Sequence, residues 1–184
     1  MSGQDDRTRL AATPGIDFAH LTLRDALDLA VLIEAEAQER YEELAQQMAT
    51  HDSPAPAAFF RAMAVNEAKH GAQLAERRRA LFADAPRTVT RAMLWDVEAP
   101  DYDEARAFMS AHEAMRVALR AEKKAHVFFS TALPEIGDPG VEHLFTELCA
   151  EEVVHQDLVK AELAKLPPER EAGDDDFADE PNAQ

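Results

Sequence analysis

Cysteine is almost absent from the sequence, since Cys149 is the only thiol among 184 residues. One thiol can form neither an internal disulfide nor a four-thiolate metal site, so the chain suits a reducing compartment. Long hydrophobic runs are absent too, because no apolar stretch approaches the roughly 18 residues of a membrane span. The first residues contain no apolar core behind positive charge, so we expect no signal peptide, no membrane partner and a cytoplasmic protein.

Basic residues are few. The 19 Lys and Arg residues stand against 36 Asp and Glu residues, which gives a formal net charge of -17. Phosphate groups of nucleic acids and of anionic membranes would repel such a chain, whereas cations would be attracted to it. We therefore expect no nucleic-acid partner.

The alternation of Val, Ile and Thr that marks a β-strand is also missing. Instead, segments rich in Ala, Leu, Glu, Lys and Arg are separated by breaks that contain proline, which predicts an all-α protein. Thr22 and Ser53 are the expected caps of the first two helices. We expect the long helices over about 22–49, 53–82, 103–133 and 141–166.

The lengths of the links predict how these helices are arranged. Two links are short and one, 83–102, is long, which indicates two helical hairpins joined by a crossover that holds at most a short helix. We expect a bundle over 18–166, with an N-terminal extension at 1–17 and an acidic tail at 167–184. The tail is poor in apolar residues, so we expect it to be disordered.

Carboxylates interrupt the apolar faces of these predicted helices. Glu34 fills the place in the apolar register between Ala30 and Ala37. Glu67 and His70 lie three residues apart and therefore project from adjacent turns of one helix face. Both patterns recur in the second half of the chain, which indicates a duplicated hairpin. The polar residues that we expect to face the core are Glu34, Glu67, His70, Glu122, Glu152 and His155.

Four glutamates on one core surface would repel one another, and each would lose its hydration. Two divalent cations would offset the four carboxylates, and two imidazoles would complete the ligand set. Di-iron and di-manganese carboxylate bundles use this arrangement: one glutamate from each of two helices and Glu-x-x-His from each of the other two. An oxygen-rich site favours iron over zinc. We predict two iron ions; manganese, a mixed pair and a metal-free polar network stay open.

The chain resembles the ferritin-like superfamily, and most closely the di-iron domain of the rubrerythrin family. The resemblance covers about residues 20–166 and is carried by EAEAQERYEELA (34–45), FFRAMAVNEAKH (59–70), AEKKAHVFFSTAL (121–133) and FTELCAEEVVH (145–155). It implies an all-α, ferritin-like four-helix bundle of two helical hairpins joined by a long crossover. It also implies that the six core-facing residues are the metal ligands. Among them, Glu67 or Glu152 and the ligands that lie opposite them are the candidates for bridging the two metals.

The sequence differs from the rubrerythrin pattern in two ways. Rubrerythrins carry an additional glutamate where this sequence has Ala125, so the six-ligand set is closer to that of bacterioferritins. We therefore do not expect a ligand exchange that relies on that glutamate. We also expect no rubredoxin-like domain, because one cysteine cannot hold a four-thiolate iron site, and therefore expect electrons to come from a separate donor such as a rubredoxin-like protein.

Other residues lie next to the expected ligands. The resemblance places Tyr41 within reach of a ligand carboxylate, although its repeat partner Phe129 favours a packing role, and both roles stay open. Asn66 and Glu151 each precede a Glu-x-x-His glutamate, where the resemblance implies a partner that orients the opposite histidine. The alternative is an ordinary polar helix residue. Gly71, in mid-helix, is expected to allow helices to approach closely beside the metals.

The leading functional hypothesis is a non-haem di-iron oxidoreductase, in which two Fe(II) ions give electrons to hydrogen peroxide or dioxygen. The alternative is a ferroxidase that serves iron storage. Further alternatives are a di-iron hydroxylase and a non-catalytic helical bundle. By family analogy we also expect a homodimer, in which a partner would cover apolar positions such as Leu32 and Phe128.

Overall fold

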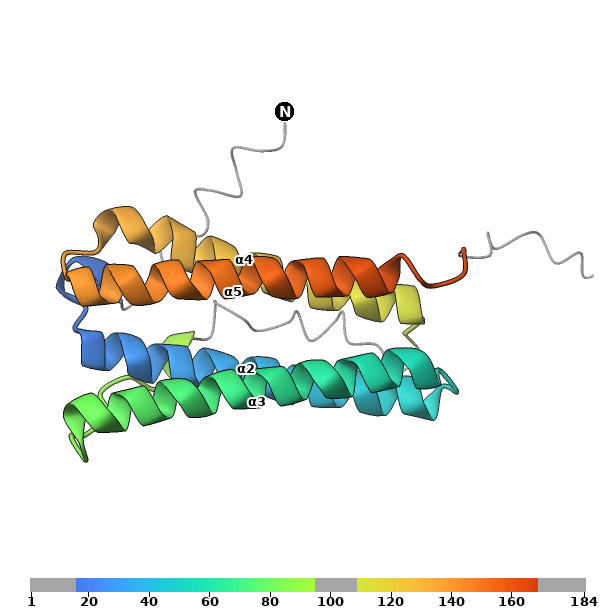
Figure 1. Ribbon diagram of the computed structural model, residues 1–184, viewed down its shortest axis with the longest axis horizontal. Coiled ribbons are helices and arrows are strands. Elements are labelled where there is room, and N and C mark those ends of the chain that lie inside the picture. The colour runs from blue at the N-terminus through green and yellow to red at the C-terminus, as the bar shows by residue number, and fades with distance from the viewer. Residues whose placement is uncertain (1–15, 95–108, 169–184) are drawn as a thin grey trace, which may run out of the picture.

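The computed structural model describes residues 16–94 and 109–168, and in these ranges the chain forms helices and turns but no strand. The long helices of this part (Figure 1) are α2 at Leu23–Thr50, α3 at Pro54–Phe82, α4 at Ala111–Ala132 and α5 at Pro139–Leu163. Short 3-10 helices lie in the connections, namely η1 at Phe18–His20, η2 at Arg91–Leu94 and η3 at Leu133–Glu135. The predicted all-α architecture is confirmed.

The long helices form two antiparallel hairpins, α2 with α3 and α4 with α5 (Figure 1). The helix α3 ends at one end of the bundle, whereas α4 begins at the other end. The two helix ends that the link joins therefore lie at opposite ends of the bundle, as the predicted crossover requires. None of the described helices is both long and apolar enough to cross a membrane.

Side chains before the helices determine where several of them begin. Thr22 accepts a hydrogen bond from the backbone N–H of Asp25 at 3.2 Å, so it caps α2 as predicted. Ser53 occupies the cap position of α3, but its side chain makes no capping bond. Asp138 accepts a bond from the N–H of Gly140 at 2.7 Å. This cap starts α5 slightly before the predicted boundary of 141, and the helix also ends before the predicted 166.

The third long helix begins later than we predicted. We expected it from about Asp103, but α4 begins at Ala111, and residues 95–108 lie outside the described part. Ser110 has an extended backbone and forms a capping box with Glu113, in which each side chain bonds the other's backbone N–H, at 3.2 Å and 2.8 Å. This reciprocal pair satisfies two donors that a helix start leaves open, and it fixes the boundary.

Two apolar clusters fill the bundle on either side of a polar layer. The first contains, among others, Leu27, Ile33, Phe129 and Phe145. The second contains, among others, Tyr41, Met48, Phe60 and Met115. Along each long helix, one cluster precedes the positions of the predicted ligands and the other follows them. The polar layer is therefore closed by apolar side chains toward both ends of the bundle.

Phe128 belongs to this interior, contrary to our expectation that a partner subunit would cover it. Its exposed fraction is 3%, and its ring centroid lies 5.8 Å from that of Phe18 and 5.2 Å from that of Phe129. The 3-10 helix η1 covers this position because it precedes α2 and brings Phe18 onto the first cluster. Leu32 is only partly buried against the same cluster.

A buried ion pair fastens the start of the crossover to the bundle. Arg78 on α3 donates to both carboxylate oxygens of Asp28 on α2, at 3.0 Å and 3.2 Å, and both residues are buried. The same guanidinium donates to the carbonyl oxygens of Ala83 at 2.9 Å and Ala85 at 2.6 Å. Arg78 thus holds the segment after α3 against α2. Further along, Arg91 forms ion pairs with two carboxylates of α2, the half-buried Glu36 and the exposed Glu39.

We predict that Arg78→Met lowers the free energy of unfolding by about 3 kcal/mol, because it leaves a buried carboxylate without its main partner. Arg77→Met is the matched control, since the neighbouring Arg77 pairs with Glu147 at the surface and such pairs contribute about 0–1 kcal/mol. Urea denaturation of both variants measures the difference. Equal losses in the two variants would contradict the role assigned to Arg78.

Candidate metal centre

The structure brings all six predicted ligands into the polar layer between the two apolar clusters. Each of the four helices contributes its side chains at the positions expected from the apolar register. His70 is half-buried, whereas the other five are buried: Glu34, Glu67, Glu122, Glu152 and His155. Their burial is what the interrupted apolar stripes predicted.

A fully buried group lies around His155. Glu122, Glu152 and His155 each offer a donor atom, and these atoms lie within 4.8 Å of one another. The His155 Nδ1 atom is 3.4 Å from a carboxylate oxygen of Glu122 and 3.3 Å from one of Glu67. We call the triad of Glu122, Glu152 and His155 the inner position.

A more open group lies around His70. Glu34, His70 and Glu151 also offer donor atoms within 4.8 Å of one another, and both His70 and Glu151 are half-buried. The Nδ1 atom of His70 is 4.0 Å from the Oε2 atom of Glu34, and neither of these buried atoms has a hydrogen-bond partner. We call this triad of Glu34, His70 and Glu151 the outer position.

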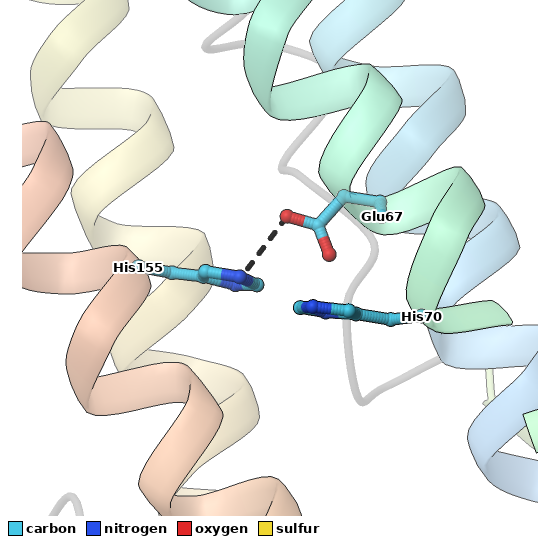
Figure 2. A group of neighbouring side chains, drawn as sticks. All are labelled: Glu67, His70 and His155. Carbon is cyan, nitrogen blue, oxygen red and sulfur yellow. Dashed lines mark ion pairs between the residues drawn. The ribbon is translucent and has the colours of Figure 1, made fainter. Parts of the chain in front are cut away.

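Glu67 connects the two positions. Its donor atoms form a further group with those of His70 and His155, again within 4.8 Å. Figure 2 shows the Glu67 carboxylate above two histidine rings that approach from opposite sides, with its ion pair to His155 as a dashed line. The rings are nearly parallel, with centroids 5.3 Å apart. Among the predicted ligands, Glu67 therefore lies between the histidine of the inner position and that of the outer position.

Burial and neighbouring charges set the protonation of these groups. Burial raises the pKa of Glu34 to about 7, although a hydrogen bond with Glu67 and the charge of His155 oppose the rise. Burial also acts to raise the pKa of Glu122, but hydrogen bonds with His155, Glu152 and Tyr41 outweigh it and lower that pKa. Burial acts to lower the pKa of His155, but the hydrogen bond with Glu122 and the charges of the nearby glutamates together outweigh it, so that pKa is raised. Protons thus replace part of the positive charge that cations would supply.

Tyr41 joins the two hairpins at this layer. Its hydroxyl, on α2, donates a hydrogen bond to Glu122 on α4, and its ring is fully buried 6.0 Å from the ring of Phe60. The repeat partner Phe129 has no hydroxyl and packs against Phe145 at 5.1 Å. Tyr41 therefore both bonds a predicted ligand and packs in the core, so the two roles left open by the sequence coexist.

Gly71 allows the close approach that its place in mid-helix predicted. A Cβ atom at this position would lie 3.3 Å from the Cβ atom of Glu34, which is tighter than ordinary van der Waals contact. Any larger residue would have to displace Glu34 by a few tenths of an ångström. The glycine thus lets α2 and α3 approach at the outer position.

Asn66 and Glu151 do not make the contacts implied by the family resemblance. In the described part of the chain, neither side chain forms a hydrogen bond to a histidine. Glu151 instead lies in one donor group with Glu34 as well as His70, which the sequence analysis missed. The available signal was that it directly precedes Glu152, so it sits at the edge of the same helix face.

We predict that the metal-free protein loses stability as the pH rises from about 5 to about 8. The pKa of Glu34 is about 7 in the folded chain, above its ordinary value of 4.5. Protonated Glu34 therefore contributes its full share to the free energy of unfolding below pH 4.5, and this share is lost as the pH rises through about 7. The difference between the two pKa values corresponds to a loss of about 3 kcal/mol in the free energy of unfolding. Urea denaturation in EDTA across this range measures it.

Glu34→Gln should flatten this dependence, because an amide has no proton to lose. Glu43→Gln is the control, since it makes the same chemical change at an exposed position of the same helix. If Glu34→Gln and the wild type show the same slope, Glu34 is not the group responsible.

Comparisons with known proteins agree with this geometry. The family described as Rubrerythrin matches residues 25–163. The crystal structure of an uncharacterised conserved protein from Magnetospirillum magnetotacticum MS-1 is similar, with a TM-score of 0.67 and 30% identity over 82% of this chain and 99% of that one. A comparison with curated proteins finds no match. The predicted ferritin-like bundle is thereby confirmed.

Proposed function

Because the chain belongs to the rubrerythrin family, as a ferritin-like di-iron domain, we propose that it is a non-haem di-iron oxidoreductase that reduces hydrogen peroxide or dioxygen. The observation that carries the proposal is the pair of buried atoms without hydrogen-bond partners, Glu34 Oε2 and His70 Nδ1, which face each other across 4.0 Å. Buried polar atoms are normally satisfied, and a cation between these two would satisfy both.

The donor set fits a pair of iron ions. Carboxylate oxygens and imidazole nitrogens are ligands that iron accepts, and the four glutamates supply the charge to balance two divalent cations. Glu34 and His70 would hold the outer ion, while Glu122, Glu152 and His155 would hold the inner one, with Glu67 between them. Iron in such a site supplies the electrons for the reduction of the oxidant.

The chain's own residues prepare the site in three ways. Glu34 holds a proton near neutral pH and would release it when a cation binds, because its pKa is about 7. The hydroxyl of Tyr41 fixes the orientation of Glu122. The two apolar clusters close the layer toward both ends of the bundle and limit the access of water.

A ferroxidase that serves iron storage is the second candidate. It is supported by Ala125, which is buried in the first apolar cluster at the place where rubrerythrins carry an additional glutamate. The chain therefore has no carboxylate at that place for a ligand exchange. Manganese or a mixed metal pair in the same donors remains a further proposal.

The proposed oxidoreductase needs partners. A single cysteine cannot form a rubredoxin-like site, so we propose that a separate electron donor resets the centre. We also propose a homodimer on family analogy. Leu32 and Phe128 were the apolar positions that we expected a partner subunit to cover. Phe128 is buried within the bundle, so only the half-buried Leu32 is left for such a contact.

Stopped-flow oxidation distinguishes the two candidate functions. Protein loaded without oxygen at two Fe(II) per chain should react much faster with hydrogen peroxide than with dioxygen, and it should retain about two iron ions per chain. Glu67→Ala should lose this reaction, whereas the exposed-site control Glu43→Gln should keep it. A faster reaction with dioxygen, together with uptake of further iron, would favour the ferroxidase. Failure to bind iron would overturn both functions.

Tyr41→Phe tests the contribution of the hydroxyl to the site. We expect the variant to bind two iron ions but to react more slowly, because Glu122 loses the donor that orients it. The metal-free variant should lose about 1–3 kcal/mol of stability, since a buried acceptor loses its hydrogen bond. Stopped-flow spectroscopy and urea denaturation measure the two effects. Wild-type behaviour in both would show that Tyr41 serves packing alone.

A further inference from the structure

The outer position holds a carboxylate that the six-ligand set does not include. Glu151 lies on α5, immediately before Glu152, and its donor atom is within 4.8 Å of those of Glu34 and His70. The side chain is half-buried at the edge of the polar layer. Its negative charge faces Glu34 and His70 from the opposite hairpin.

The neighbours of Glu151 are atoms that need a partner. Glu34 is 4% exposed, and its Oε2 atom has no hydrogen bond. The Nδ1 atom of His70 is likewise buried without a partner. Three side chains that can bind a metal therefore converge here: Glu34, His70 and Glu151. Glu34 and His70 each have a buried atom that lacks a hydrogen-bond partner. A cation would complete all three contacts, whereas a hydrogen bond between Glu151 and His70 would leave Glu34 unsatisfied.

We propose that Glu151 is itself a ligand of the outer metal ion, which makes the centre a set of seven protein donors. The inference rests on the proposed di-iron function. The corresponding residue of the other hairpin is the amide Asn66, which has no negative charge to offer the inner position. The duplicated hairpins thus build unequal positions. The inner ion is held by buried residues alone, whereas the outer ion is held at the edge by an additional carboxylate.

This arrangement has a consequence for metal exchange. His70 and Glu151 are half-buried, so the outer ion lies on the side open to solvent and exchanges first. With Glu151, the centre has five carboxylates in place of four, and these carry a charge of -5 when all are ionised. Such a charge favours two metal ions whose summed charge is greater than +4. The additional carboxylate therefore stabilises the oxidised form of the centre relative to the reduced form.

Titration with Mn(II) alone tests the ligand role without measuring activity. Free Mn(II) is followed by electron paramagnetic resonance in the wild type, in Glu151→Gln and in Glu147→Gln. Glu147 is the matched control, because it lies one turn earlier on α5 and is half-exposed beside Arg77. We expect two ions in the wild type and in the control, and at least a tenfold loss of affinity for one of the two ions in Glu151→Gln.

The outcomes separate this inference from the proposed function. If the wild type binds no metal, both fail. If the wild type binds two ions and Glu151→Gln binds them equally well, only the role of Glu151 is overturned. A crystal structure of the Mn(II)-loaded wild type decides how Glu151 acts: a carboxylate oxygen at about 2.2 Å from the outer ion supports the proposal. A carboxylate bonded to His70 and away from the metal overturns it, even if the affinity has changed.

Discussion

The burial of several carboxylates in the middle of a helix bundle is the constraint on which the rest of the structure depends. Each carboxylate has lost its hydration and repels the others, so the bundle requires compensating positive charge at this layer. In the metal-free chain that charge comes from protons and from His155, which explains the raised pKa of Glu34 and of His155. Cations that replace the protons convert an unfavourable interior into a binding site.

The apolar clusters make this arrangement possible. They contain the large buried side chains and lie on both sides of the polar layer, so the helices remain packed even when the layer is strained by repulsion. Away from the layer, Arg78 and Asp28 form a second buried polar contact that is compensated locally. The molecule thus keeps an ion pair with balanced charges where the crossover starts, and it gathers an excess of carboxylates in the polar layer.

Sequence periodicity was enough to place the predicted ligands, because the register of a long amphipathic helix fixes which residues face the core. It could not place the start of α4, since the capping box of Ser110 and Glu113 competes with other polar pairs in the same segment. It also misjudged Phe128, which is covered by Phe18 from a 3-10 helix outside the four long helices. Whether Glu151 lies beside His70 depends on the distance between α5 and α3. The apolar pattern of a single helix does not give that distance.

Duplication explains why the six predicted ligands occur as matching sets in the two hairpins, and the differences between the two halves explain why the inner and outer positions are unequal. Tyr41 corresponds to Phe129, so only one of the two hairpins sends a hydroxyl to the opposite carboxylate. Gly71 lets Glu34 lie close to α3, and Glu151 adds a carboxylate on the same side. Tyr41 thus adds a contact at the buried inner position, whereas Gly71 and Glu151 add space and a carboxylate at the outer one. The two halves of a duplicated scaffold have therefore become unequal: the donors of the inner position are all buried, whereas His70 and Glu151 of the outer position are half-buried.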